Sequence, residues 1–375
     1  MGQRITALRQ QGVDVIRIDI GSPDLPPPEF VIEALVAEAR RPDTHGYTPY
    51  GGTPAFKEAV AAYYHQRFGV TLDPQTEVLA LIGSKEGLFH LAQALLNPGD
   101  LVLVPDPGYP TYRAGAKIAG AQVYFMPLEA QNGFLPDLDA IPEEVARRAR
   151  LMWLNYPNNP TSAVAPRAFF EKVVAFARRY EILLAHDAPY VDVTFDGYRA
   201  PSLLEVPGAK EVAVEFNSFS KAFNMAGWRL GMMVGHPDAV RHVHVYKSQL
   251  DTSHFLPILR AGATALTHPQ AEEWIRWRNS VYAERRDIIL EALAQTRLTA
   301  DKPRASLYVW ARLPAGERDS KAFCERLLQE AGVSTTPGVV FGPHGEGYLR
   351  ISLGTATEKI REAMERLVAW EQKRS

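Results

Sequence analysis

One lysine stands between small hydroxyl residues and an arginine, shortly after an apolar run. A lysine amine condenses with a carbonyl group when it is deprotonated in a desolvated pocket. Hydroxyl groups and a guanidinium are natural partners of a phosphate. Lys221, with Ser218, Ser220 and Arg229 around it, is therefore a candidate for holding a phosphorylated aldehyde cofactor through a Schiff base. The alternative for this stretch alone is a solvated lysine beside an arginine.

Further candidate side chains stand in loops that follow apolar runs. Ser84 and Lys85 open a helical segment, whose free backbone N–H groups form an anion site. A plain turn with Ser84 as the helix N-cap explains that motif equally well. Tyr109 lies among prolines at the end of another run and can stack on a heteroaromatic ring. Asp187 follows a buried-looking run, so it needs strong hydrogen-bond donors or a cationic partner such as a protonated pyridine nitrogen.

Three more residues extend this set. Asn159 and Tyr190 lie in two further loops, where both can donate to a phenolate oxygen on the same ring. Arg350 interrupts an apolar pattern, and its rigid fork suits a substrate carboxylate. Each residue taken alone is as readily a turn former, a cap or an exposed strand residue.

Seven short apolar runs alternate with helix-period segments between about residues 76 and 235. The runs are 78–82, 101–104, 122–125, 151–154, 182–185, 212–214 and 231–234. Buried strands that alternate with helices are typical of a mostly parallel sheet between two layers of helices. Ligands bind at the C-terminal ends of such strands, where the candidate residues stand. The sequence therefore predicts a large α/β domain over residues 39–257.

The pattern differs at the two ends of the chain. A polar segment, 1–12, precedes an alternating run that predicts a strand over 13–20. The elements expected near the C-terminus are strands at 306–310 and 348–352, a helix at 320–330, and a last helix that starts with Thr355 and Glu358 spaced as a capping box. These elements predict a smaller, discontinuous α+β domain made of residues 1–38 and 258–375.

Composition favours small-molecule chemistry. The 375 residues carry a net charge of −2 with no basic stripe, which argues against a nucleic-acid partner. No apolar run approaches the ~20 residues of a membrane span, and no secretion signal opens the chain, so we expect a cytoplasmic protein. The single cysteine, Cys324, fits a reducing compartment. His242 and His244 face different ways on a helix, and we expect no metal site.

The ordered set of motifs resembles the fold-type I pyridoxal-phosphate enzymes, specifically the class I/II aminotransferase family. The resemblance runs from about Asp19 to the end of the chain. It rests on Gly21-Ser22-Pro23-Asp24, Tyr47-Thr48-Pro49-Tyr50-Gly51-Gly52-Thr53, Gly83-Ser84-Lys85, Tyr109, Asn159-Pro160-Thr161, Asp187 with Tyr190, Ser218-x-Ser220-Lys221, Arg229 and Arg350. It implies a transaminase that uses pyridoxal 5'-phosphate and forms a homodimer.

The resemblance also implies a role for each residue. Lys221 binds the cofactor and then shuttles a proton at the substrate Cα, while Asp187 keeps the pyridine nitrogen protonated. Tyr109 stacks on the ring, and Asn159 and Tyr190 contact its phenolate oxygen. The phosphate is held by Ser84, the backbone of Lys85, Ser218, Ser220, Arg229 and Tyr47 of the neighbouring subunit. The substrate α-carboxylate meets Arg350, with Gly21 and Asn159 lining that site.

Two departures from the family pattern are visible. Ser162 stands where the motif Asn-Pro-Thr-Gly usually has glycine, so we expect a slightly altered turn after Asn159. The chain also begins close to its first expected strand, without the longer N-terminal arm common in relatives. Either the arm is absent or the sequence is truncated, and the property affected is the stability of the dimer.

Two positively charged side chains indicate the class of substrate. Arg350 argues for an amino acid over a simple amine, and Lys85 either points its ammonium toward a distal carboxylate or is solvated. The phrase 83–88 looks like the diaminopimelate and aspartate aminotransferase branches. We therefore expect an acidic or diaminopimelate-type amino donor, with 2-oxoglutarate and glutamate as the other pair. The alternatives are a pyridoxal-phosphate-dependent carbon–sulfur β-lyase and a non-catalytic module that senses the cofactor.

Overall fold

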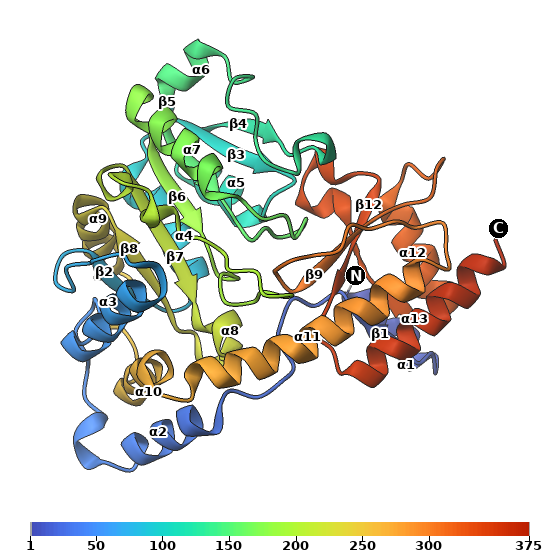
Figure 1. The fold of residues 1–375 in the computed structure, drawn as a ribbon, viewed down its shortest axis with the longest axis horizontal. Coiled ribbons are helices and arrows are strands. Elements are labelled where there is room, and N and C mark those ends of the chain that lie inside the picture. The colour runs from blue at the N-terminus through green and yellow to red at the C-terminus, as the bar shows by residue number, and fades with distance from the viewer. Residues whose placement is uncertain (1, 375) are drawn as a thin grey trace.

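Seven strands form one large sheet in the computed structural model, which describes residues 2–374 (Figure 1). Their order is β2-β8-β7-β6-β5-β3-β4. The bounds are β2 Val78–Leu81, β3 Leu101–Asp106, β4 Gln122–Pro127, β5 Ala149–Leu154, β6 Leu183–Asp187, β7 Ala213–Ser218 and β8 Gly231–Gly235. β8 runs antiparallel to β2 and β7, and the other pairs are parallel. The predicted mostly parallel seven-stranded sheet is confirmed.

Helices cover both faces of this sheet because successive strand residues point to opposite sides. In β5, Leu151 and Trp153 pack with α4 (Ser84–Leu95), α5 (Pro110–Ile118) and α9 (Pro237–Lys247). Met152 and Leu154 pack on the other side. The helices there are α3 (Pro54–Phe68), α7 (Arg167–Tyr180) and α10 (Leu256–Thr267). Two apolar layers therefore hold the sheet rigid. The remaining helices near it are α2 (Glu29–Ala39), α6 (Glu143–Arg148) and the short α8 (Phe219–Ala222).

A second apolar core lies beside the large sheet (Figure 1). It contains an antiparallel sheet of β11 (Thr336–Pro337), β12 (Tyr348–Ser352) and β9 (Tyr308–Arg312), and a parallel pair of β1 (Ile16–Arg17) with β10 (Val333–Ser334). The helices of this part are α1 (Gly2–Gln10), α12 (Ser320–Ala331) and α13 (Thr357–Gln372). Both ends of the chain thus meet in one unit. The exact domain boundaries stay a prediction.

The longest helix, α11 (Ala271–Leu293), joins the two cores. Its first turns carry Trp274 and Ile275 against the core of the large sheet. Its later turns bury Tyr282 and Ile289 in the second core. A single rigid helix therefore passes close to the boundary between the two parts.

Two local predictions differ from the structure. The strand expected over 13–20 covers only Ile16–Arg17, and the polar segment before it, for which no element was predicted, is a helix with Ile5 buried against Val15 and Leu328. The expected capping box does not form, since α13 starts after Ala356 without a side-chain cap. Thr355 instead donates its hydroxyl to the carbonyl oxygen of Arg17 at 2.8 Å. Tertiary partners outcompeted the local pattern in both places.

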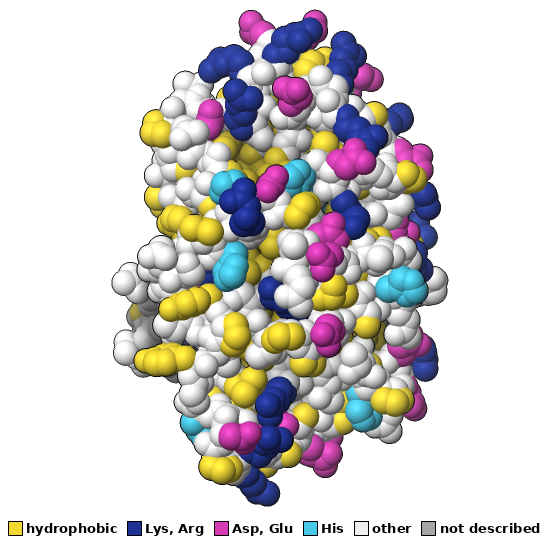
Figure 2. Space-filling view, turned by 90° about the vertical axis from the view of Figure 1, so that its left-hand side faces the viewer, with side chains coloured by type: hydrophobic (Ala, Val, Ile, Leu, Met, Phe, Trp, Pro, Cys, Tyr) yellow, Lys and Arg dark blue, Asp and Glu magenta, His cyan; other side chains and the backbone are white. Residues whose placement is uncertain are grey.

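The surface of the large part carries both charge signs. On the face that includes α2, α3 and α10, basic and acidic side chains are interspersed with hydrophobic ones (Figure 2). That face therefore presents no continuous field of one sign for a nucleic acid. Among residues 2–374, no helix is both long and apolar enough to cross a membrane.

Candidate active site

A cavity of about 420 Å³ opens at the C-terminal ends of the parallel strands. Its volume is in the range of ~300–1,000 Å³ that small-molecule sites occupy. The residues singled out from the sequence that line it are Gly21, Ser84, Lys85, Tyr109, Asn159, Asp187, Tyr190, Ser218, Ser220, Lys221, Arg229 and Arg350. Tyr47 is 91% exposed and does not line it. The fold thus brings together segments spread over more than 300 residues of sequence.

Lys221 sits on α8, which directly follows β7. Ser218 starts this helix by accepting a hydrogen bond from the N–H of Ser220 at 3.2 Å. The ammonium group of Lys221 donates to the carbonyl oxygen of Gly21. Burial lowers the pKa of Lys221 to about 8, and the charges of Arg350 and Arg229 add to the effect. The amine is therefore far more available as a nucleophile near neutral pH than an ordinary lysine.

An anion cradle forms where α4 begins. Its N-cap is Gly83, so the alternative with Ser84 as the cap is wrong and Ser84 is the first helical residue. A Cβ atom on Gly83 would lie 2.2 Å from a terminal nitrogen of Arg229, and one on Gly231 would lie 2.6 Å from the backbone nitrogen of Ser84. Glycine is thus needed for the close approach. The Arg229 guanidinium also lies 3.5 Å from the hydroxyl of Ser220. Hydroxyls, free N–H groups and a guanidinium converge here, as a phosphate requires.

Asp187 closes the far wall at the end of β6. One carboxylate oxygen, Oδ2, accepts a hydrogen bond from the hydroxyl of Tyr112 at 2.7 Å. The other, Oδ1, is buried and has no hydrogen-bond partner among residues 2–374. Burial raises the pKa of Asp187 to about 6. A buried carboxylate oxygen without a partner fits a protonated ring nitrogen.

Arg350 occupies the opposite end, on β12. It donates to the side-chain oxygen of Asn159 at 2.8 Å and to the carbonyl oxygen of Asp19 at 3.0 Å. Its Nε has no partner, and no carboxylate of residues 2–374 pairs with it. Tyr308 lies under the guanidinium at 4.1 Å, and its hydroxyl is 2.8 Å from that of Tyr190. The arrangement leaves a positive charge ready for an external carboxylate.

Comparison with known proteins identifies the chain. The family model for aminotransferase class I and II matches residues 13–367. The chain belongs to this family. The LL-diaminopimelate aminotransferase of Moorella thermoacetica is 52% identical over 97% of this chain and 93% of its own length. That of Aquifex aeolicus is 46% identical over 96% and 92%.

Solved structures agree with this assignment. A protein from Thermus thermophilus, described as a probable N-succinyldiaminopimelate aminotransferase, has a TM-score of 0.92 at 42% identity and covers 98% of both chains. Substrate-bound BacF from Bacillus subtilis has a TM-score of 0.93 at 39% identity, covering 98% of this chain and 95% of its own. The protein is therefore a fold-type I aminotransferase that uses pyridoxal 5'-phosphate.

The residues of this aminotransferase fit that cofactor. The anion cradle at α4 suits its phosphate, the unpartnered Oδ1 of Asp187 suits its ring nitrogen, and the amine of Lys221 suits its aldehyde. When bound, pyridoxal phosphate supplies an electron sink for a carbanion at the substrate Cα. In residues 2–374 no cluster of three or more His, Cys, Asp or Glu side chains could hold a metal ion.

Several residues of the site escaped the sequence analysis. Tyr112 holds Asp187, and Tyr308 lies beneath Arg350. Asn155 donates to the carbonyl oxygen of Asp187 at 2.7 Å and accepts from the N–H of Asn159 at 2.8 Å. Asn155 follows the strand run 151–154, so a polar residue at a strand end was a usable signal. The two tyrosines carry none, because an aromatic residue in an apolar run, such as Tyr308, or at the start of a helix, such as Tyr112, is normally part of the core.

Ser162 shows what the departure from the family motif does. Its φ is 60°, a left-handed conformation that glycine adopts most easily. The serine hydroxyl donates to the carbonyl oxygen of Tyr308 at 2.7 Å. This hydrogen bond stabilises the serine in a conformation that glycine would adopt at lower cost.

Proposed function

We propose that this aminotransferase takes a diaminopimelate-type amino donor and exchanges its amino group with the 2-oxoglutarate and glutamate pair. The observation that carries the proposal is the guanidinium of Arg350, which has no carboxylate partner within residues 2–374 and lines the same cavity as Lys221. Such a charge selects a substrate with an α-carboxylate. The names of the most similar relatives, which are LL-diaminopimelate aminotransferases, support this donor over aspartate or glutamate as the preferred one.

The roles of the cavity residues follow from their positions. Lys221 is the base for the proton on the substrate Cα, since its lowered pKa gives a neutral amine near the working pH. Asp187 holds a proton on the ring nitrogen, and Tyr109 covers the ring face. Asn159 and Tyr190 serve the phenolate oxygen. The phosphate is assigned to Ser84, the backbone of Lys85, Ser218, Ser220 and Arg229.

Lys85 is the candidate for recognising the distal end of the donor. Its side chain is exposed at the edge of the cavity and makes no hydrogen bond or ion pair with residues 2–374. A second carboxylate on the substrate would give this ammonium a partner. We expect Lys85→Ala to lower kcat/KM for LL-diaminopimelate by about tenfold and to leave that for a neutral amino acid unchanged. Equal effects on both donors would contradict this role.

We also propose a homodimer in which Tyr47 reaches the phosphate of the neighbouring subunit. The side chain is 91% exposed, and Tyr50, Leu250 and Phe255 are also exposed hydrophobic residues near it in sequence or structure. Thr48 joins these segments by donating to the carbonyl oxygen of His254 at 2.7 Å. A large exposed tyrosine in a protein of this family is explained by a partner subunit. Sedimentation of wild type and Tyr47→Phe, with cofactor affinity measured for each, tests the proposal.

The visible absorption spectrum of the purified protein tests the reaction. LL-diaminopimelate or L-glutamate, added without an oxo acid, should bleach the visible band of the bound cofactor and release the matching oxo acid in one stoichiometric turnover. If glutamate bleached the cofactor band and diaminopimelate did not, the proposed donor would be wrong, while the transaminase activity would stand. Release of pyruvate and ammonia from cystathionine would favour the β-lyase alternative.

A further inference from the structure

Arg278 lies on α11 with its side chain fully buried, next to the helix that carries Lys221. Its Nη1 donates to the carbonyl oxygens of Lys221 and Ala222, the latter at 2.6 Å. These are the last carbonyls of α8, so no later N–H of that helix can satisfy them. We propose that Arg278 is a positioning residue for Lys221, fixing the backbone from which the amine projects. The proposal rests on the role of Lys221 proposed above.

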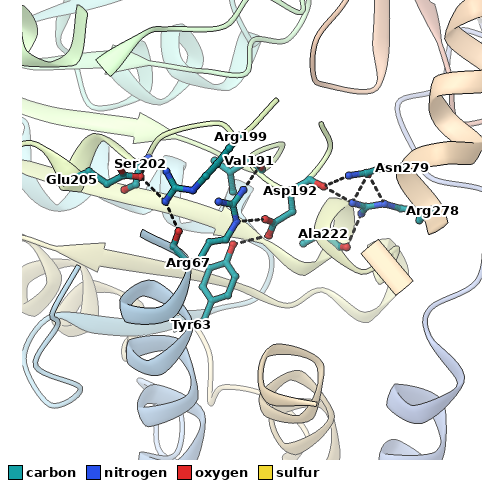
Figure 3. Close-up of polar contacts among 10 residues, drawn as sticks. All are labelled: Tyr63, Arg67, Val191, Asp192, Arg199, Ser202, Glu205, Ala222, Arg278 and Asn279. Carbon is teal, nitrogen blue, oxygen red and sulfur yellow. Dashed lines mark hydrogen bonds and ion pairs between the residues drawn. The ribbon is translucent and has the colours of Figure 1, made fainter. Parts of the chain in front are cut away.

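The same guanidinium also contacts the loop that follows the cavity residues Asp187 and Tyr190. Its Nη2 donates to the carbonyl oxygen of Asp192 at 2.5 Å, and the amide of Asn279 donates to the same oxygen at 3.0 Å (Figure 3). Asp192 lies in the loop that follows Asp187 and Tyr190. The planar fork of one arginine therefore ties the segment that carries the amine to the segment that carries the ring-binding carboxylate.

Asp192 is itself fixed from the side opposite Arg278 in Figure 3. Its carboxylate accepts hydrogen bonds from the hydroxyl of Tyr63 at 2.6 Å and from Nε of Arg67 at 3.1 Å, both on α3. The carbonyl that Arg278 grips thus belongs to an anchored loop. Movement of α8 relative to the end of β6 would break bonds at both ends of the guanidinium.

If the side chain at position 278 only filled space, an apolar residue would be expected there. No carboxylate of residues 2–374 forms an ion pair with Arg278, and burial lowers its pKa to about 10. A buried charge held by carbonyl groups and one amide carries a desolvation penalty that an apolar side chain of similar volume avoids. What the arginine provides is its set of directed hydrogen bonds to Lys221, Ala222 and Asp192.

Arg286 supplies a matched control on the same helix. It is equally buried, and it donates to the carboxylate of Asp196 at 2.8 Å and to the carbonyl oxygen of Pro303 at 2.9 Å. Neither partner lines the cavity. Removing Arg286 leaves the buried carbonyl oxygen of Pro303 and the half-exposed carboxylates of Asp196 and Asp287 without this donor, whereas removing Arg278 affects the backbone of Lys221.

The test compares the holoenzymes of Arg278→Gln, Arg278→Lys and Arg286→Gln. We expect Arg278→Gln to lower kcat by about 10²-fold, because misplacing a reacting group by about 1 Å costs that much. KM should change by less than ~threefold, since the substrate contacts are intact. Arg278→Lys should recover part of the rate, because an ammonium can reach some of the carbonyls. Arg286→Gln should lower the melting temperature with kcat within ~twofold of wild type.

A second readout uses the cofactor-free proteins. Each is labelled with an amine-reactive ester over a range of pH, and labelling of Lys221 is followed by peptide mass spectrometry. The pH midpoint for Lys221 should shift in the Arg278 variants and stay at the wild-type value in Arg286→Gln. If the Arg278 variants and Arg286→Gln had the same kcat and the same labelling midpoint for Lys221, the proposal would be overturned. If Arg278→Gln does not fold, Arg278→Lys carries both measurements.

Lys221→Ala separates this inference from the proposed function. If Lys221→Ala kept transaminase activity, the assigned role of Lys221 would fail whatever Arg278 does. If Lys221→Ala were inactive while both Arg278 variants kept wild-type kcat and labelling, only the positioning role would fail.

Discussion

The cavity around Lys221 and a second cavity between α3, the end of α10 and the start of α11 differ in how their charges are satisfied. The second is larger, at about 600 Å³ against about 420 Å³. Its three guanidinium groups all have carboxylate partners: Arg67 with Asp192, Arg199 with Glu205 and Arg276 with Glu272. In the smaller cavity, Arg350 and Lys85 have no such partner within residues 2–374.

The comparison shows that charged and polar groups without partners mark the candidate site better than cavity volume does. Buried polar groups in proteins are normally hydrogen-bonded, so an exception such as Oδ1 of Asp187 calls for a ligand. In the smaller cavity, burial also lowers the pKa of Lys221 and raises that of Asp187, so an amine and a carboxyl group both have shifted pKa values there. The larger cavity is a polar gap whose charges stabilise one another.

The largest expected effect is at the reactive amine. Lys221→Ala should lower kcat of transamination by about 10⁴-fold, because it removes the base for the substrate Cα proton. Single-turnover kinetics with glutamate measure the loss. A small amine added to the variant should restore part of the rate, whereas a variant with a wild-type rate would remove the distinction between the two cavities.

The next effect is at the unpartnered carboxylate. Asp187→Asn should lower kcat by about 10²-fold, because the ring nitrogen loses the negative charge that keeps it protonated. Tyr112→Phe is the control, since it keeps the charge and removes only the 2.7 Å hydrogen bond to Oδ2. We expect it to cost less than tenfold by the same assay. If Tyr112→Phe lost more kcat than Asp187→Asn, the hydrogen bond would matter more than the charge, and the prediction would be contradicted.

A smaller effect is expected at the substrate end. Arg350→Lys should lower kcat/KM for amino acids by about 10- to 100-fold, since an ammonium cannot make the bidentate contact. Arg312→Lys, an exposed arginine on the neighbouring strand β9, is the matched control and should stay at the wild-type value. Steady-state kinetics of both variants decide the point. Equal values would contradict a carboxylate at Arg350.

Replacing Lys221 should lower activity but raise the free energy of unfolding of the cofactor-free protein. The folded pKa of Lys221 is about 8, below the ordinary value of 10.5, so the unfolded chain binds more protons between these values. Burial of the ammonium therefore destabilises the cofactor-free protein below about pH 8, and this penalty fades as the pH rises to 10.5. Lys221→Met should stabilise it at pH 7 by about 1–3 kcal/mol, with a smaller gain at pH 10. Urea unfolding at both pH values checks the sign.

The smallest effect belongs to the second cavity. Arg276→Gln removes an exposed ion pair with Glu272 and should change the free energy of unfolding by less than about 0.5 kcal/mol. Its kcat should equal that of the wild type. A clear loss of activity in this variant would show that the larger cavity also takes part in the function.

Residue types and local spacing predicted the strands of the large sheet and most of the candidate residues that line the cavity. The seven apolar runs became the seven strands, and the motif around Lys221 lies at the end of one of them. Where the sequence failed, local and tertiary preferences disagreed. Thr355 left its expected cap for the backbone of Arg17, and the strand expected over 13–20 pairs with β10 only at Ile16–Arg17.

The sequence by itself predicted that the chain alternates strands and helices, that polar residues at strand ends line one cavity, and that Lys221 is the candidate reactive amine. These follow from periodicity and from the chemistry of side chains, which are local properties. Only the tertiary structure decided that Tyr112 holds Asp187, that Arg350 has no carboxylate partner within residues 2–374 and that Arg278 donates to the backbone of Lys221. Such contacts join residues far apart in sequence, and burial, which sets their pKa values and their energies, exists only in the folded chain.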